Sequence, residues 1–240
     1  MRIAAYQAPL LPAGSRAAIA LIGHQVKRCE DEGVSILCCP EAILGGLADN
    51  SASPLDFAIR VAGGGLAARL APLASRTVTT IVGFTEVDGG SLYNSAVVWH
   101  DGAVAGVYRK WHPAIRKSVY LSGLEAPVFA AGGFTFGVIL CNDSNFEQPA
   151  RTLVAQGARA LFVPTNNGMP ADRGGANLVE AARDCDVAFA RRQHVPVIRA
   201  DVAGRHDGLI SYGSSSIVNA HGEVIRSAPL LAEALLIGEI

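Results

Sequence analysis

The sequence FGVILCNDSNF, from Phe136 to Phe146, joins an apolar segment to a run of polar residues. Its first five residues are apolar or glycine, which is typical of a strand that is covered on both faces. Cys141 follows directly, and the polar side chains from Asn142 to Asn145 come next. A cysteine in this place is either part of the core or a nucleophile held where a sheet opens to solvent. A nucleophile needs a base and an oxyanion donor. Residues of these kinds at the ends of other strands would therefore favour a nucleophile over a core cysteine.

The composition predicts a folded chain. The chain has 240 residues, of which 50% are hydrophobic and 17% are charged. That balance favours a large core over disorder, and the length fits one α/β domain over residues 1–240. The formal net charge of −1 argues against nucleic acid or an anionic membrane as the main partner.

The cysteines indicate a reducing compartment. Their number is odd, and no CxxC pair with metal-ligand spacing occurs, so we expect free thiols without disulfides or a zinc site. The first residues, MRIAAYQAPL, lack the long apolar segment of a signal peptide, and no apolar run reaches membrane-spanning length. We therefore expect a cytoplasmic protein without a cofactor. The cysteines other than Cys141 fit core positions, and these are Cys29, Cys38, Cys39 and Cys185.

Strand and helix patterns alternate along the chain. Asp101-Gly102 and Gly132-Gly133 each lie between two apolar segments, which predicts two β-hairpins. Shorter apolar segments elsewhere predict parallel strands joined by helices. Together these elements favour an α/β fold with two mixed sheets and helices outside them. The predicted helices cover residues from Ser15 to Gly33, about 55–75, about 142–156 and about 176–193.

Three apolar strands end on reactive residues. Glu41 follows VSILCCP, Lys110 ends VAGVYRK, and Cys141 follows FGVIL. Because sites in α/β folds gather beyond the carboxyl ends of strands, these side chains can converge. A carboxylate could then take the thiol proton, while Lys110 and the backbone N–H of Asn142 stabilise a tetrahedral oxyanion.

Each of these residues also has a simpler explanation. Cys141 could pack in the core, Glu41 could face solvent at a strand end, and Lys110 could belong to a basic surface with its neighbour. His112 is the one histidine near these residues in sequence. The pair Asn166-Asn167 could line a pocket or form part of a turn.

Three blocks resemble the signatures of the nitrilase superfamily, the carbon–nitrogen hydrolases. They are PEAILGG at 40–46, YRKWHPA at 108–114 and VILCNDSNF at 138–146. Supporting similarities occur in AAYQAP, LYNSAVV and GSSSIVNAHGEVI, so the resemblance covers essentially the whole chain in order. It implies a four-layer α-β-β-α sandwich that assembles into a homodimer or larger homo-oligomer. It also implies a triad in which Glu41 is the general base, Lys110 stabilises the oxyanion and Cys141 is the nucleophile.

The sequence departs from the family pattern at several positions. Ser118 stands near the place where many members carry a second glutamate, and Glu147-Gln148 replaces a common Pro-Glu pair. Asn142-Asp143 follows the cysteine where nitrilases typically have Trp-Glu. These differences favour hydrolysis of a small-molecule amide or carbamoyl group over that of a nitrile. Asn142, His112 and Asn166 are the expected oxyanion or substrate-binding residues.

Several alternatives stay open from the sequence. Within the superfamily they are a nitrilase, an acyl transferase or a binding scaffold with impaired catalysis, for which Ser118 is the main support. Outside it, a Cys-His hydrolase of another fold would use His112 as its base. Arg116, Lys117 and Arg173 could receive a carboxylate or phosphate of the substrate, or could face water.

Overall fold

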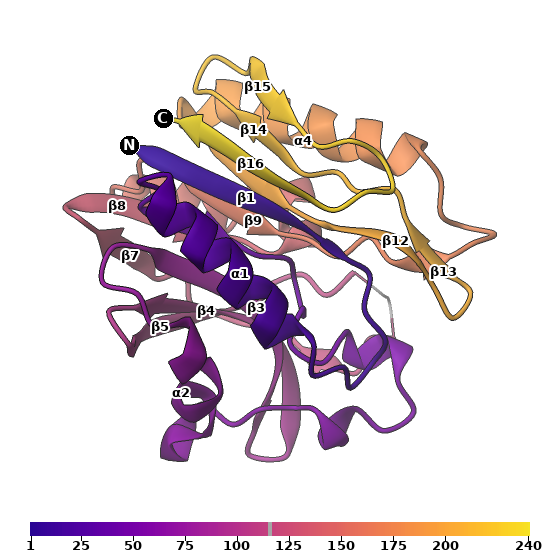
Figure 1. Ribbon diagram of the computed structural model, residues 1–240. Helices are drawn as coiled ribbons and strands as arrows, with labels where there is room; N and C mark the ends of the chain where they lie inside the picture. Colours follow the sequence, from indigo (N-terminus) through magenta and orange to yellow (C-terminus); the bar gives the residue numbers. More distant parts are fainter. Residues whose placement is uncertain (115–116) are drawn as a thin grey trace.

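The computed structural model describes residues 1–114 and 117–240. Two mixed β-sheets pack against each other, and helices cover their outer faces (Figure 1). The prediction of a four-layer α-β-β-α sandwich is therefore confirmed.

The first sheet is built around the N-terminal strand. Its main path runs β10-β13-β12-β1-β2-β3-β4-β5, with β16 paired to β1 and β6 paired to β4. Strand β1 is parallel to β2 and β12 and antiparallel to β16, so the first and last strands lie side by side (Figure 1). The strands are β1 Arg2–Pro9, β2 Ile36–Cys38, β3 Thr79–Asp88, β4 Ser91–His100, β5 Ala103–Arg109, β6 Tyr120–Leu121, β10 Met169–Pro170, β12 Val202–His206, β13 Leu209–Ser211 and β16 Ala234–Glu239.

The second sheet has the strand order β15-β14-β11-β9-β8-β7. Its central strands β8, β9 and β11 are parallel, so their carboxyl ends point to one edge of the sheet. Cys141, Thr165 and Asp201 follow these strands at that edge. The strands are β7 Val128–Ala131, β8 Phe134–Val138, β9 Leu161–Pro164, β11 Val197–Ala200, β14 Ser216–Val218 and β15 Val224–Ser227.

Three apolar clusters hold the layers together. One lies between the sheets and includes Ile36, Phe136 and Phe162, all fully buried. A second joins the first sheet to α1 (Ala18–Asp31) and α2 (Gly65–Leu70), and a third joins the second sheet to α3 (Ala150–Ala155) and α4 (Asn177–Gln193). Burial of this apolar surface is the main stabilising contribution to the fold.

Two of the predicted helices are wrong in extent. The helix expected over about 55–75 is reduced to α2, flanked by short 3-10 turns, because Gly63 and Gly64 adopt left-handed φ angles of 80° and 82°. The helix expected directly after Cys141 is interrupted, since the 3-10 turn η5 (Cys141–Asn145) ends at an extended Phe146 before α3 begins. The remaining turns are η1 Ala48–Asn50, η2 Pro54–Asp56, η3 Ala62–Gly64 and η4 Ala71–Leu73.

The helix expected between Ser15 and Gly33, the extent of the helix expected over about 176–193 and both hairpins are confirmed. The buried side of α1 carries Ala18, Ile22, Val26 and Cys29, as the helical spacing predicts. Asp101 and Gly102 have φ angles of 47° and 71°, which a tight hairpin between β4 and β5 requires.

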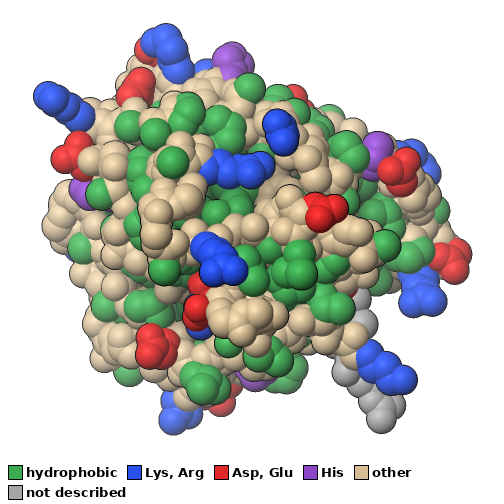
Figure 2. Space-filling view, turned by 90° about the horizontal axis from the view of Figure 1, so that it is seen from below, with side chains coloured by type: hydrophobic (Ala, Val, Ile, Leu, Met, Phe, Trp, Pro, Cys, Tyr) green, Lys and Arg blue, Asp and Glu red, His purple; other side chains and the backbone are tan. Residues whose placement is uncertain are grey.

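The surface carries charges of both signs. Seen from below the view of Figure 1, positive, negative and hydrophobic side chains are interspersed (Figure 2). In the part of the chain that the structure describes, no helix has both the length and the apolar character needed to cross a membrane. Within residues 1–114 and 117–240, no group of three or more His, Cys, Asp or Glu side chains is placed to hold a metal ion.

Candidate active site

Cys141 begins the turn η5 with an unusual backbone conformation. Its φ angle is 42°, in the left-handed region that a residue with a side chain adopts at a cost of about 1–3 kcal/mol. The hydroxyl of Ser144 donates a 2.8 Å hydrogen bond to the carbonyl of Cys141 and closes the turn. The thiol is partly exposed, whereas Cys29, Cys38 and Cys39 are buried.

Asp143 fastens this turn to the neighbouring sheet. Its carboxylate accepts hydrogen bonds from the Tyr108 hydroxyl at 2.7 Å and from the backbone N–H of His112 at 2.8 Å. Tyr108 and His112 lie on either side of Lys110 in the chain. The turn that begins at Cys141 is thus held next to the segment that carries Lys110.

Glu41 and Lys110 form a buried ion pair. The distance from Lys110 Nζ to Glu41 Oε1 is 2.6 Å, and the residues are 3% and 1% exposed. Oε1 also accepts a 2.8 Å hydrogen bond from Asn94 Nδ2, and Oε2 accepts one of 2.9 Å from the backbone N–H of Asn166. These donors, together with Lys110, fix the orientation of the carboxylate.

A glycine on the adjacent strand lets the Glu41 segment pack closely. A Cβ at Gly83 would lie 2.6 Å from Glu41 Cα and 2.4 Å from the backbone nitrogen of Ala42. Side chains do not tolerate such distances, so glycine at this position of β3 is a condition for the observed place of Glu41.

Lys110 carries a positive charge in this setting. Burial lowers its pKa, but Glu41, the Cys141 thiol and Asp143 together raise it by more, so the pKa lies above its ordinary value. A buried ammonium beside the thiol is therefore available as a donor to a developing negative charge.

The thiol of Cys141 is protonated at neutral pH. Burial and the charge of Glu41 raise its pKa to about 12, although Lys110 acts in the opposite direction. The two charged groups thus lie near enough to act on the sulfur. A thiol in this state needs a base before it can attack a carbonyl carbon.

Arg199 connects the elements around the thiol from within the core. It is 2% exposed, and its Nε lies 2.7 Å from Oδ2 of Asp186 on α4. Its other nitrogens donate to Ser144 Oγ at 3.0 Å and to Thr165 Oγ1 at 2.7 Å. The Thr165 carbonyl in turn accepts from the backbone N–H of Glu41 at 3.2 Å.

Sequence and structure comparisons converge on one family. The pattern described as carbon-nitrogen hydrolase matches residues 2–240. The chain belongs to the carbon–nitrogen hydrolase family. The prediction of that superfamily is therefore confirmed, and an alternative built on another fold is wrong.

Relatives in the family differ in their named activities. The chain is 30% identical to a nitrilase of Pyrococcus abyssi over 90% of this chain and 80% of the relative. It is 29% identical to the N-carbamoylputrescine amidase of Arabidopsis thaliana over 72% and 63% of the two chains. It is 28% identical to a glutamine-dependent NAD(+) synthetase of Xylella fastidiosa, of which it spans 39%.

Solved structures share the carbon–nitrogen hydrolase fold at lower identity. Saccharomyces cerevisiae Nit3 matches 99% of this chain and 89% of its own, with a TM-score of 0.86 and 17% identity. An amidase of Nesterenkonia AN1 from the nitrilase superfamily matches the same shares, with a TM-score of 0.81 and 21% identity.

The other predicted site residues, Asn166, Asn142 and His112, contact different groups. Asn166 contacts Glu41 through its backbone N–H and, at 3.4 Å, through Nδ2 to the Glu41 carbonyl. Asn142 Nδ2 donates to the His112 carbonyl at 3.0 Å, and the His112 ring stacks on Phe146 with 3.9 Å between ring centroids. Their proposed roles at the substrate stay predictions.

The segment after Lys110 does not supply a second glutamate from the Ser118 position. Ser118 Oγ donates to Asp49 Oδ2 at 2.9 Å, and the N–H of Val119 donates to Asp49 Oδ1 at 2.8 Å. Lys117 and Arg173 are exposed. The substrate-anchoring role considered for Arg116 falls on a residue outside the described ranges.

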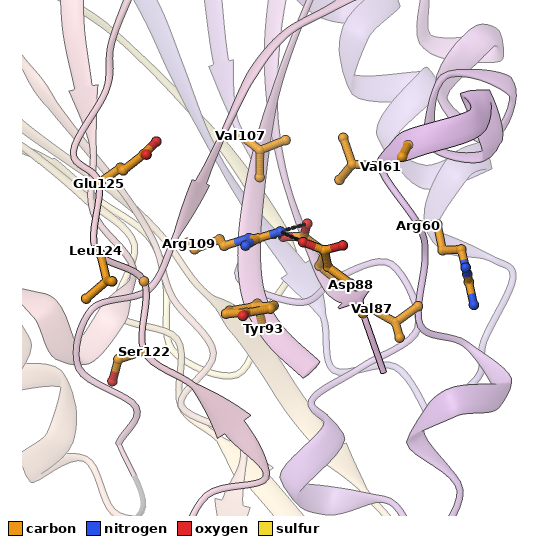
Figure 3. Close-up of a pocket in the computed structure, with 14 residues that line it drawn as sticks. Arg60, Val61, Val87, Asp88, Tyr93, Val107, Arg109, Ser122, Leu124 and Glu125 are labelled. Atoms are coloured by element: carbon orange, nitrogen blue, oxygen red, sulfur yellow. Dashed lines mark hydrogen bonds and ion pairs between the residues drawn. The ribbon is translucent and has the colours of Figure 1, made fainter. Parts of the chain in front are cut away.

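One cavity of this hydrolase chain lies away from the three predicted catalytic residues. Its volume is about 600 Å³, and Arg109, Tyr93 and Leu124 contribute to its lining (Figure 3). Arg109 stacks over the Tyr93 ring at 4.0 Å and pairs with Asp88 at 2.8 Å. Because neighbouring strand residues point to opposite faces, Arg109 faces this cavity while Lys110 faces the interior. None of the three predicted catalytic residues lines the cavity.

Sequence reasoning missed Asp201, Ser214 and Arg199, and it left Asn167 either at a pocket or in a turn. Asp201 is fully buried and follows β11 as Cys141 follows β8, so a polar residue at a buried strand end was the available signal. Arg199 is the one charged residue in the apolar strand sequence VPVIRA, which is a second signal.

Proposed function

We propose that this carbon–nitrogen hydrolase cleaves an amide or N-carbamoyl group of a small molecule through a thioester at Cys141. The observation that supports it most is the 2.6 Å ion pair of Glu41 and Lys110, buried beside a thiol that is protonated at rest. An ordinary core cysteine has no need of a charged pair next to it, because burying two charges is unfavourable without compensation.

In the first step Glu41 accepts the thiol proton as sulfur attacks the carbonyl carbon. A bond forms between Sγ and carbon, and the carbonyl oxygen becomes an oxyanion. Lys110 Nζ and the backbone N–H of Asn142 stabilise that oxyanion. Since the thiol pKa is about 12, proton removal by Glu41 occurs together with attack rather than before it.

In the second step the tetrahedral intermediate expels nitrogen. The carbon–nitrogen bond breaks as Glu41 returns its proton to the nitrogen, and ammonia or an amine leaves. A water molecule then gives a proton to Glu41 and attacks the thioester. Collapse of the second oxyanion breaks the bond between carbon and Sγ as Glu41 returns its proton to the sulfur, so the acid product leaves and both the thiol and the Glu41 carboxylate are restored.

The residues after Cys141 support an amide over a nitrile as the substrate. Asp143 is occupied by Tyr108 and by the backbone of His112, so its carboxylate serves the turn rather than a substrate. The visible triad completes the amide reaction by itself. An N-carbamoyl substrate contains the same primary amide nitrogen, and an N-carbamoyl compound is the substrate that the name of the Arabidopsis relative gives.

Turnover of a compound panel tests the proposal. Primary amides, ureido acids and nitriles are incubated with the protein, and ammonia release is measured alongside acyl-enzyme mass. We expect release from at least one amide or ureido acid, loss of it in Cys141→Ala, and an acyl adduct on Cys141. The matched control is Cys185→Ala, because Cys185 is also partly exposed and its thiol donates to Asn145 Oδ1 at 3.1 Å. Preferred turnover of nitriles over every amide, or acyl transfer to an added amine in place of water, would assign the other activities of the superfamily.

A further inference from the structure

Asn167 presents a fixed hydrogen-bond acceptor to the thiol. Its side-chain Nδ2 donates to Asp201 Oδ2 at 3.0 Å and to Ser214 Oγ at 3.2 Å. Its backbone N–H donates to Asp201 Oδ1 at 3.0 Å. The remaining side-chain atom, Oδ1, lies 3.9 Å from Cys141 Sγ and accepts the S–H contact.

The orientation of this amide is set by its buried partner. Asp201 is fully buried, and it also accepts from Ser214 N–H at 3.0 Å, Ser214 Oγ at 2.7 Å and Val202 N–H at 2.8 Å. A carboxylate accepts hydrogen bonds and donates none, so the NH₂ group of Asn167 must face Asp201. The carbonyl oxygen is then left facing the sulfur.

We propose that Asn167 Oδ1 accepts a hydrogen bond from the N–H of the substrate nitrogen, and so selects a primary amide or carbamoyl group over an ester or a nitrile. This inference rests on the proposed function. In the tetrahedral intermediate the nitrogen is two bonds from Sγ, and an N–H···O hydrogen bond of about 2.9 Å to Oδ1 fits within the observed separation. The S–H contact at 3.9 Å is long, so a substrate N–H replaces it readily.

The same contact orients the nitrogen for departure. Asn166, the neighbouring residue, holds Glu41 Oε2 through its N–H at 2.9 Å, so the Glu41 carboxylate is anchored one residue away from Asn167. A nitrogen whose N–H points to Asn167 has its lone pair free to face the protonated Glu41. That is the geometry in which Glu41 can transfer its proton to the leaving group.

Substrates without an N–H lose this interaction. An ester places an oxygen opposite Oδ1, so two acceptors face each other, and a nitrile brings no hydrogen to the contact. A site built to bind a substrate N–H discriminates against an analogue that lacks it, because the site's own polar group is left unpaired.

A pair of substrates with one acyl group separates these effects. The wild-type protein and Asn167→Leu are compared on a primary amide that the panel identifies and on the p-nitrophenyl ester of the same acid. For the amide we expect kcat/KM to fall on the order of 10- to 100-fold in Asn167→Leu. The ester rate should change by less than about threefold, because no N–H contact is lost there.

Two further variants control for structural damage. Asn167→Ser removes the acceptor but keeps a hydroxyl that can donate to Asp201, so it tests the idea if Asn167→Leu fails to fold. Asn177→Leu makes the same chemical change at an exposed position of α4 and should leave both rates unchanged. Thermal unfolding reports on the fold of each variant.

The outcomes distinguish this inference from the function on which it rests. Equal loss of amide and ester turnover in the folded variants would show that Asn167 has only a structural role. Unchanged amide turnover would show that Asn167 takes no part in the reaction. Either result overturns the inference but leaves the proposed function standing. A wild-type protein that hydrolyses no amide or ureido acid in the panel would overturn both. Selective loss of amide turnover supports it.

Discussion

The guanidinium of Arg199 and the carboxylate of Asp186 form an ion pair in the interior of the protein, at 2.7 Å between Nε and Oδ2. Their side chains are 2% and 0% exposed. The pair joins α4 to β11, and its free N–H groups reach the turn of Ser144 and the end of β9 at Thr165. The geometry around the thiol therefore depends on a charged pair that does not touch it.

Removal of one partner of this pair should be strongly destabilising. Arg199→Met leaves Asp186 charged and unpaired inside the core, which typically lowers the free energy of unfolding by about 3–5 kcal/mol. Urea unfolding measures the change. Arg151→Met is the control, because its pair with Glu147 is exposed and contributes about 0–1 kcal/mol. A loss at Arg199 no larger than that at Arg151 would contradict the assigned role.

Substitution of either charged residue at the thiol should slow the chemical step. Lys110→Met removes an oxyanion donor and should lower kcat by about 100- to 1000-fold. Glu41→Gln keeps the shape of the side chain but cannot accept the thiol proton, and should lower kcat on the order of 100- to 10,000-fold. Steady-state kinetics on the same substrate gives both values. A rate near that of the wild type in either variant would return that residue to a structural role.

The pH dependence of thiol alkylation should reflect the raised pKa of Cys141. The thiolate is the reactive form, and burial raises the pKa to about 12, so the thiolate fraction grows about tenfold per pH unit over the whole range below that value. Iodoacetamide labelling of Cys141, followed by peptide mass spectrometry between pH 6 and about 10, should rise without a plateau. A plateau near neutral pH would show a preformed thiolate instead.

Hydrolysis of the thioester should limit the overall rate. Ser118 is engaged with Asp49, and the sequence lacks at that position the second carboxylate that many family members carry, so water is less well positioned for deacylation. Rapid-quench measurements should show a burst of ammonia close to one equivalent, followed by a slower steady rate. A linear time course from the first turnover would argue against this step.

The protein is expected to self-associate. The expectation comes from the family resemblance, in which sandwiches pack together, and from a sequence in which we find no linker or charge block. Sedimentation velocity at micromolar concentrations should show a dimer or larger species. A stable monomer across that range would contradict it.

Local signals in the sequence identified the three candidate catalytic residues, whose roles stay predictions. Glu41, Lys110 and Cys141 each follow an apolar strand, and the carboxyl ends of neighbouring strands meet in space. The orientation of Asn167 was not predicted, because it comes from Asp201 and Ser214, which lie 34 and 47 residues further along the chain. The spacing of neighbouring residues in the sequence does not predict a contact between residues so far apart in the chain.

The same limit applies to the fold. The two mixed sheets, the two hairpins and the extent of α4 follow from apolar periodicity and turn residues, which act over a few positions. The four-layer sandwich was implied by the family resemblance. The segment over about 55–75 was predicted as a helix from its apolar content, although Gly63 and Gly64 take left-handed angles that a continuous helix excludes. Their effect outweighs helical periodicity in the short stretch around them.

At position 141, cysteine is not the residue that would make the fold most stable. Glycine adopts a φ angle of 42° without a steric penalty, so Cys141→Gly should unfold at a higher denaturant concentration than the wild type does. Evolution under selection for stability alone would be expected to replace this cysteine. Its presence in a left-handed turn supports the reactive role proposed for its thiol.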